Sequence, residues 1–187
     1  MHTRLSRYFE VLGKLPLVTE ASNLKGETLP LSTVYEDMTA RIYATHAAGN
    51  KLMFIGNGGS AGIASHMAID YSKNGNVRAQ AFNDGAALTC LGNDLGYENV
   101  FSKQVDLHAR PGDLLIAISS SGKSENIIRA AKLARERGCF VLTLSGFSGD
   151  NPLRALGDWN LFVNSGEYGF VELTHLSLCH AILDLAM

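Results

Sequence analysis

The sequence has little cysteine, proline and tryptophan, little net charge and no long apolar run. Its 187 residues include 3 cysteines, 4 prolines and 1 tryptophan, and the formal net charge is −2. This near-neutral balance lacks the basic surplus typical of nucleic-acid-binding proteins. No run approaches the roughly 20 apolar residues that cross a bilayer, and no signal-peptide pattern opens the sequence. We therefore expect a cytoplasmic protein with no nucleic-acid or membrane partner.

The cysteines are too few and too scattered to define a scaffold. Cys90, Cys139 and Cys179 are odd in number, widely spaced and set in apolar surroundings. Such spacing fits neither a disulfide framework nor a cysteine-rich zinc cluster. We expect all three to be reduced thiols in the core.

The remaining composition is that of a folded globular protein, with 46% hydrophobic and 18% charged residues. A chain of this length suffices for one domain with a sizeable core. Residues 1–14 have a helical pattern that stops before Pro16, and a second helical pattern runs from Ser32 to Ala48. The polar segment 19–30 between them is predicted to be a linker.

These patterns divide the chain without separating it into two domains. We expect residues 1–187 to form a single domain, with an N-terminal helical arm at 1–48 and an α/β core at 49–187. Such an arm often packs against another subunit.

From residue 51 onward, strand-like and helix-like apolar patterns alternate. Alternation with short connections predicts an α/β protein, a three-layer α/β/α sandwich with a mainly parallel sheet. In such folds ligands bind at the carboxyl ends of the strands. The predicted strands are 51–55, 77–82, 113–118, 139–145 and 159–163, and the predicted helices are 60–73, 85–92, 124–137 and 168–186.

A glycine-rich turn follows the first of these strands. Gly56, Gly58 and Gly59 allow the backbone to turn sharply and to approach a ligand closely. A helix that begins at Ser60 directs free N–H groups and the positive end of its dipole toward that ligand, which favours an anion. The dinucleotide-binding fingerprint does not fit, because Gly62 is one position late and the expected acidic residue is missing.

The helix after this turn carries two polar residues on one face. His66 and Asp70 are four residues apart, so their side chains are neighbours on the helix surface. Imidazole and carboxylate groups so placed can bind a metal ion or a sugar hydroxyl together.

A serine-rich loop, Ile118-Ser-Ser-Ser-Gly-Lys-Ser124, follows the third predicted strand of the core. Four hydroxyls and several backbone N–H groups at a helix N-terminus can surround a phosphate without a fixed charge. The alternative is a flexible turn with Ser124 as an ordinary helix N-cap. Three further serines exceed what capping requires, and this favours a phosphate site.

In combination, these motifs resemble those of the phosphoheptose isomerases, enzymes of the sugar-isomerase (SIS) fold. The resemblance runs from about residue 32 to the C-terminus. The segments that carry it are Gly56-Asn-Gly-Gly-Ser60 with His66, Cys90-Leu-Gly-Asn-Asp94, the serine loop, and Glu172-x-x-His175-x4-His180.

The resemblance implies an aldose–ketose isomerase that converts sedoheptulose 7-phosphate to a glycero-manno-heptose 7-phosphate. That reaction begins the synthesis of the heptose of bacterial surface polysaccharide. The resemblance also implies a homotetramer, in which the active sites are shared between subunits and contain a divalent metal, usually Zn²⁺.

The resemblance also implies roles for individual residues. The sugar phosphate is expected at the serines, and the sugar hydroxyls at the glycine turn and Asp94. The metal and catalytic positions are expected to be His66, Asp70, Glu172 and His180. The implied substrate-binding residues are Asn57, Gly58, Ser60, Asp94, Ser119, Ser120, Ser121, Ser124 and Glu172.

Isomerisation moves a proton between C1 and C2 of the sugar and passes through an enediol(ate). A histidine and a carboxylate can share the proton transfers, and a metal can act as a Lewis acid. We expect His180 to be the carbon acid–base and Asp70 its partner, with His66 and Glu172 as supporting ligands. His175 is either functional or a buried, hydrogen-bonded histidine.

Four residues depart from the family pattern. Asp70 replaces the usual glutamate, which displaces the carboxylate by about 1.5 Å, and such a shift can cost about a hundredfold in rate. Glu172 replaces a glutamine and adds a charge that favours a dication but opposes an anionic enediolate. Asn74 replaces an arginine, and Gly169 replaces an acidic residue. These changes leave the identity of the sugar open.

Two other classes of protein are compatible with the fold. One is a catalytically silent SIS protein, similar to the regulator that associates with the bacterial replication initiator, but the retained His66, Asp70 and His180 argue against it. The other is a sugar-phosphate sensor joined to a DNA-binding domain, for which the first 50 residues are too short and too weakly basic.

Overall fold

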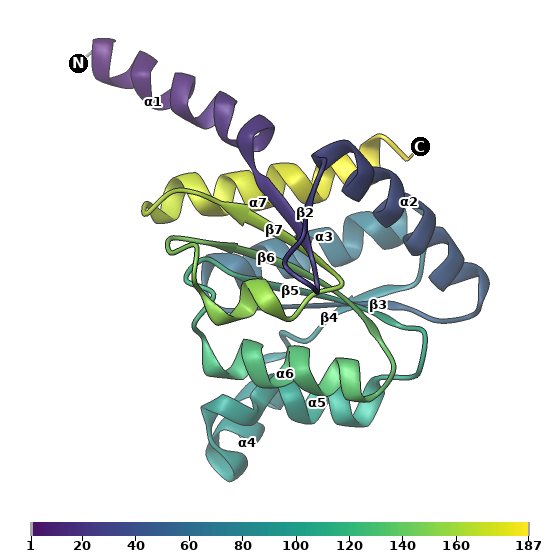
Figure 1. Ribbon diagram of the computed structural model, residues 1–187. Helices are drawn as coiled ribbons and strands as arrows, with labels where there is room; N and C mark the ends of the chain where they lie inside the picture. The colour runs from purple at the N-terminus through teal and green to yellow at the C-terminus, as the bar shows by residue number, and fades with distance from the viewer. Residues whose placement is uncertain (1, 187) are drawn as a thin grey trace.

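The computed structural model describes residues 2–186 and contains a seven-stranded sheet in the order β2-β1-β7-β6-β5-β3-β4 (Figure 1). The strands are β1 (Glu20–Asn23), β2 (Thr28–Leu29), β3 (Leu52–Gly56), β4 (Ala79–Ala81), β5 (Leu114–Ser119), β6 (Phe140–Gly146) and β7 (Trp159–Val163). The helices are α1 (His2–Lys14), α2 (Leu31–Ala47), α3 (Gly59–Lys73), α4 (Gly85–Leu95), α5 (Val100–His108), α6 (Glu125–Glu136) and α7 (Tyr168–Asp184), with 3₁₀ turns η1 (Leu15–Val18), η2 (Tyr97–Asn99) and η3 (Pro152–Ala155).

The strands from β3 to β7 are parallel, and their side chains point alternately to two separate cores. In β3, Leu52 and Phe54 pack on the side covered by α2, α3 and α7. Met53 and Ile55 pack on the other side, against α5 and α6. Burial on both faces explains why these strands are continuous apolar runs. The predicted three-layer α/β/α sandwich with a mainly parallel sheet is confirmed.

The predicted linker at 19–30 is wrong, because this segment forms a hairpin on the edge of the sheet. β1 pairs antiparallel with β7, and β2 pairs antiparallel with β1. Asn23 holds the turn, since its side-chain oxygen accepts hydrogen bonds from the backbone N–H groups of Lys25 and Glu27. The neighbouring strand supplies the pairing for this polar sequence, and local propensity does not reveal it.

The helix α5 lies in a segment to which the sequence patterns assign no element. Its residues Val100, Phe101 and Val105 are buried in the core beneath β3 and β5. Their spacing places them on one helical face, a signal that the short length of the helix obscures. The other predicted elements are present with ends that differ by at most three residues, and the predicted strand 159–163 matches β7 at both ends.

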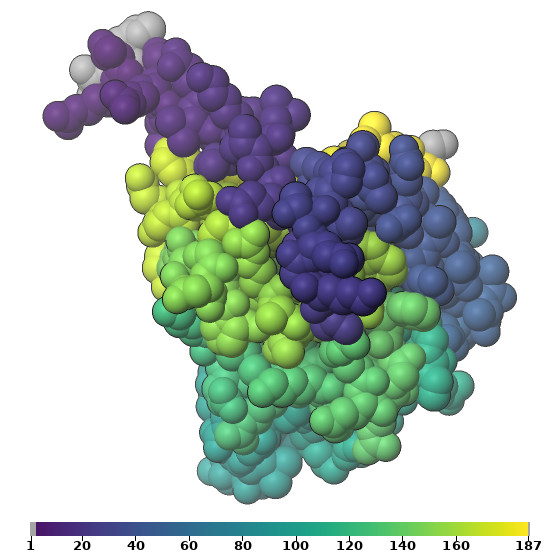
Figure 2. Space-filling view, viewed as in Figure 1, coloured from purple at the N-terminus to yellow at the C-terminus, as the bar shows by residue number. Residues whose placement is uncertain are grey.

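The N-terminal helix α1 extends away from the rest of the domain (Figures 1 and 2). Tyr8 stacks on Phe170 of α7 with ring centroids 4.6 Å apart. Leu5 and Phe9 remain 59% and 58% exposed. The predicted N-terminal helix is therefore present, and part of its apolar face is uncovered.

The cysteines are all free, but only two of them lie in the core. Burial raises the pKa of Cys139 to about 11 and that of Cys179 to about 12. Cys90 is exposed on α4, so its predicted burial is wrong. Among the described residues, no helix has the length and apolarity required to cross a membrane.

His175 is a core residue, which resolves one of the alternatives left by the sequence. It is 0% exposed on α7, and its Nε2 lies 3.1 Å from the backbone oxygen of Ser145 in β6. Burial lowers the pKa of His175 to about 4, because a charged imidazolium is poorly solvated there.

This lowered pKa predicts a loss of stability in acid. Above pH 6.5 the ring is neutral in both the folded and the unfolded chain, and between pH 6.5 and about 4 only the unfolded chain gains the proton. The free energy of unfolding should therefore fall by about 3 kcal/mol as the pH drops through this window.

Urea denaturation of the wild type and of His175→Gln at pH 7 and pH 4 measures this effect. The variant should lose about 3 kcal/mol less than the wild type between the two pH values, whatever its stability at pH 7. If both proteins lost the same free energy of unfolding between pH 7 and pH 4, His175 would not be the cause of the instability in acid.

Candidate active site

The parallel pairing of β3 with β5 brings the glycine turn and the serine loop together. Gly56 lies opposite Ile118, so the residues that follow each strand meet at the carboxyl edge of the sheet. They enclose a pocket of about 400 Å³, which we call the serine pocket. Its lining residues are Asn57, Gly58, Gly59, Ser60, Ser119, Ser120, Ser121, Ser124, Tyr168 and Glu172.

The glycine turn is held in a conformation that larger residues resist. Gly58 has φ +54°, and a Cβ on Gly56 would lie 2.5 Å from the backbone oxygen of Ser60. The backbone N–H groups of Gly59 and Ser60 make no hydrogen bond within the described part of the chain. The start of α3 therefore offers free donors to an anion.

The serine loop is held in place by contacts with Asn151 and Leu153. Gly122 has φ +62°, and a Cβ there would overlap the side chain of Asn151. Leu153 N–H also donates to the backbone oxygen of Gly122 over 3.1 Å. These contacts fix the loop without using its serine hydroxyls.

Ser124 occupies the N-cap position of α6, but its side chain makes no capping hydrogen bond within residues 2–186. It instead accepts a hydrogen bond from the Ser119 hydroxyl over 3.3 Å. Ser120 is 6% exposed, and its hydroxyl has no partner among the described residues. A buried hydroxyl without a partner is costly in the free protein, which indicates a ligand that supplies the missing bond.

The pocket contains no lysine or arginine among its lining residues, and its one carboxylate is Glu172. Glu172 lies directly against Gly59, where any Cβ would overlap the carboxylate. The serine end of the pocket is thus neutral, and the Glu172 side is negative. Sequence reasoning missed Tyr168, the first residue of α7, for which the sequence contains no specific signal.

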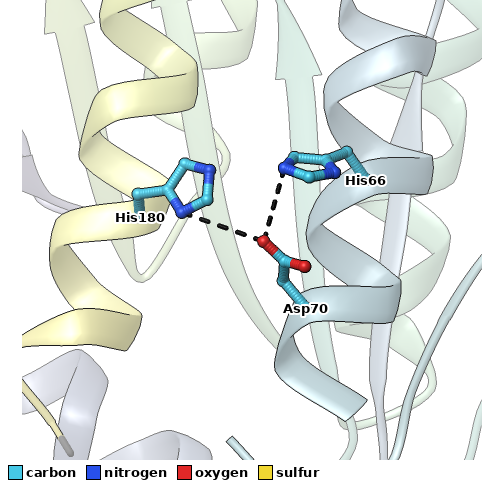
Figure 3. Close-up of side chains that lie close together, drawn as sticks. All are labelled: His66, Asp70 and His180. Atoms are coloured by element: carbon cyan, nitrogen blue, oxygen red, sulfur yellow. Dashed lines mark ion pairs between the residues drawn. The ribbon is translucent and has the colours of Figure 1, made fainter. Parts of the chain in front are cut away.

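A second group of polar residues lies between α3 and α7 (Figure 3). Asp70 Oδ2 is 3.3 Å from His66 Nε2 and 3.9 Å from His180 Nδ1. The two imidazole rings have centroids 5.4 Å apart. The carboxylate of Asp70 therefore reaches both histidines despite its short side chain.

These three residues have a donor set that suits a metal ion. One ligand atom from each of His66, Asp70 and His180 lies within 4.8 Å of the other two. Two imidazole nitrogens and a carboxylate oxygen are ligands that Zn²⁺ accepts readily. Glu172, also expected at the metal, is not part of this group and lines the serine pocket.

Two predicted substrate-binding residues have other partners in this chain. Asp94 is exposed on α4, where it accepts hydrogen bonds from the Cys90 thiol and the Asn93 amide. It does not line the serine pocket, and its contact raises the pKa of Cys90. Asn57 does line the pocket, but its amide also bonds to Asn126 and Tyr97.

The fold and these sites define the class of protein. The family model of the SIS domain matches residues 35–146, which include the glycine turn and the serine loop. The chain therefore carries a SIS domain.

Individual relatives narrow the class further. The phosphoheptose isomerase of Citrifermentans bemidjiense is 35% identical over 168 residues, which cover 87% of this chain and 85% of that protein. The phosphoheptose isomerase of Aliarcobacter butzleri is 40% identical over 143 residues, or 73% and 75% of the two chains. The solved structure of phosphoheptose isomerase GmhA from Neisseria gonorrhoeae has a TM-score of 0.83 and 29% identity, and covers 100% of this chain and 97% of that one. The chain belongs to the phosphoheptose isomerase family.

The unpartnered hydroxyl of Ser120 provides a direct test of the pocket. In Ser120→Ala, the free energy of unfolding without ligand should rise by up to about 1–3 kcal/mol, because no hydrogen bond is lost and an unsatisfied buried hydroxyl is removed. The rise in melting temperature that inorganic phosphate causes in the wild type should nevertheless shrink.

Thr143→Val is the matched control, since the buried Thr143 hydroxyl donates to the Asn160 side chain over 2.6 Å. This variant should lose about 1–3 kcal/mol and keep the phosphate response. A full phosphate response in Ser120→Ala would rule out a bond between this hydroxyl and the anion.

Proposed function

We propose that this protein is an aldose–ketose isomerase that interconverts sedoheptulose 7-phosphate and a glycero-manno-heptose 7-phosphate. The observation that carries the proposal is that α3 and α7 contribute residues both to the serine pocket and to the His66–Asp70–His180 group. The pocket lies at the starts of these helices, and the three residues lie further along them.

The spacing of these two sites fits a long, phosphorylated sugar. Glu172 and His180 are eight residues apart in α7, which is about 12 Å of helix. An extended seven-carbon sugar phosphate spans roughly 10 Å, given bonds of about 1.5 Å. With its phosphate among the serines, the reacting C1 and C2 atoms lie toward His180.

The serine end of the pocket suits the phosphate. Ser60, Ser119 and Ser120 are 3–6% exposed, and the first turn of α3 adds free N–H donors. Neutral hydroxyls, amide groups and a helix dipole bind phosphate in many proteins without a basic side chain. Glu172 faces the same cavity, and as a hydrogen-bond acceptor it is better matched to a sugar hydroxyl than to the phosphate.

The three residues between α3 and α7 suit the proton transfers. Asp70 faces Nδ1 of His180, which leaves the other ring nitrogen for the substrate. A histidine held in this way can take the proton from one carbon and return it to the next. Asp70 faces the ring from its Nδ1 side and orients it.

A divalent metal, Zn²⁺ by its donor set, is expected at His66, Asp70 and His180 in the free enzyme, and His180 must be released from it to serve as the carbon base, because a coordinated imidazole cannot take up a proton. When bound, it would act as a Lewis acid that stabilises negative charge on the substrate oxygens.

We also propose that the protein is a homotetramer with shared active sites. The exposed side chains of α1 and a groove of about 780 Å³ lined by Leu17, Tyr35, Leu185 and their neighbours are apolar surfaces suited to such an assembly. The position of Asp94 outside the pocket of its own chain is consistent with a role in another subunit's site.

His180→Ala should reduce kcat for sedoheptulose 7-phosphate by at least about a hundredfold, because the group that moves the carbon-bound proton is lost. A coupled isomerase assay measures the rate. His108→Ala, at an exposed histidine on α5, is the control and should retain wild-type turnover. Near-normal turnover in His180→Ala would refute the assigned role.

Elemental analysis after dialysis should find about one zinc ion per chain in the wild type, as a three-ligand site binds this metal tightly. His66→Ala and Asp70→Asn should each lower that content severalfold, and His108→Ala should not. An active wild type without metal would limit His66 to a hydrogen-bonding role.

A further inference from the structure

Two asparagines join the glycine turn to the serine loop. Asn57 Nδ2 donates to Asn126 Oδ1 over 2.9 Å, and Asn126 Nδ2 donates to Asn57 Oδ1 over 3.0 Å. The oxygen of Asn57 also accepts a hydrogen bond from the Tyr97 hydroxyl over 2.9 Å. The two amides thus form a closed pair, with one further donor at its edge.

The pair lies where the two halves of the pocket meet. Asn57 is the first residue of the glycine turn, directly after β3. Asn126 is the second residue of α6, two positions after Ser124, and is only 3% exposed. A displacement of either amide would therefore change the distance between Ser60 on one side and Ser124 on the other.

A buried amide needs hydrogen-bond partners, and this explains why the Asn126 side chain is bonded. It does not explain why its partner lies on the other segment of the pocket. Both side-chain bonds of Asn126 within the described chain go to Asn57, and none goes to its own loop or helix. Asn126 therefore acts between the two segments rather than within one of them.

The pocket depends on this connection because it has no charged anchor for an anion. A lysine or arginine tolerates small shifts of a phosphate, whereas neutral hydroxyl and N–H donors require correct distances and directions. The contact of Gly122 with Asn151 holds the serine loop alone, whereas the Asn57–Asn126 pair joins that loop to the glycine turn.

We propose that Asn126 is a positioning residue that sets the spacing of the two phosphate-binding segments through Asn57, an inference that rests on the proposed phosphate pocket. Asn57 then offers a ligand one amide N–H, because its oxygen and its other N–H are occupied. Tyr97, which is 61% exposed, reinforces the pair from the rim.

Titration with inorganic phosphate, followed by calorimetry, tests the proposal without requiring turnover. Asn126→Ala should weaken phosphate binding by about tenfold or more, and Tyr97→Phe by about threefold, in line with the hydrogen bonds removed. With sedoheptulose 7-phosphate, Asn126→Ala should raise KM more than it lowers kcat. Tyr97→Phe changes an exposed position and supplies a second test should Asn126→Ala fold poorly.

Asn83→Ala is the matched control, because the Asn83 amide donates to the Ala61 carbonyl over 2.8 Å and to the Ser65 hydroxyl over 2.9 Å. It removes two bonds to α3 but none to the serine loop, so phosphate affinity should stay at the wild-type level. Ser119→Ala is the reference for direct loss of a phosphate ligand and should also weaken binding.

Wild-type phosphate affinity in Asn126→Ala, or an equal loss in Asn83→Ala, would overturn the positioning role while leaving an active isomerase intact. A wild type that binds phosphate but does not isomerise the sugar would instead refute the proposed function alone. Absence of phosphate binding in the wild type would overturn both.

Discussion

The parallel pairing of β3 with β5 is the interaction on which the rest of the site depends. It sets Gly56 opposite Ile118, so that the glycine turn and the serine loop leave the sheet side by side. It also fixes where α3 and α6 begin, since each follows its strand by a short loop. The side chains of β3 and β5 are buried on both faces, which makes a shift in register costly.

The pocket formed in this way is neutral at its serine end, and this has energetic consequences. Free N–H groups and hydroxyls are less strongly hydrated than lysine or arginine, so they are cheaper to bury. Their attraction for a phosphate is directional, and it depends on a rigid arrangement. The contact of Asn151 with Gly122 and the pair of Asn57 with Asn126 provide that rigidity.

The other half of the site depends on the packing of α3 against α7. The spacing of His66 and Asp70 within one helix makes them neighbours, but only tertiary contact brings His180 to them. Asp70 has a shorter side chain than the glutamate expected from the family resemblance, yet its carboxylate lies 3.3 Å and 3.9 Å from the two histidines. The shorter side chain therefore still brings the carboxylate to both rings, and its reach to the reacting atoms of a sugar stays a prediction.

Much of this arrangement follows from local sequence patterns. Periodicity predicts the alternating strands and helices, and the glycines and serines predict an anion pocket at the carboxyl ends of the strands. The β1–β2 hairpin is not predicted, because a neighbouring strand stabilises it. The same limit applies to Tyr168, which lines the pocket, and to Asn126, which bonds to Asn57, because both placements arise from long-range packing.

Glu172 and Asp94 show that a matching motif position does not reveal where a side chain lies in the fold. Motif position places both of them at the reacting end of the substrate, whereas the structure puts Glu172 beside Gly59 and Asp94 on the exposed side of α4. A motif specifies a residue in the chain but not the direction of its side chain.

The proposed reaction moves a proton between two carbons of a seven-carbon sugar phosphate. Proton NMR of sedoheptulose 7-phosphate incubated with the zinc-loaded enzyme in D₂O follows that proton. We expect an aldose anomeric signal, with solvent deuterium incorporated at C2 of the product because an enediol intermediate exchanges its proton. An unchanged ketose spectrum, with no deuterium incorporation at C1 or C2, would contradict the proposed reaction.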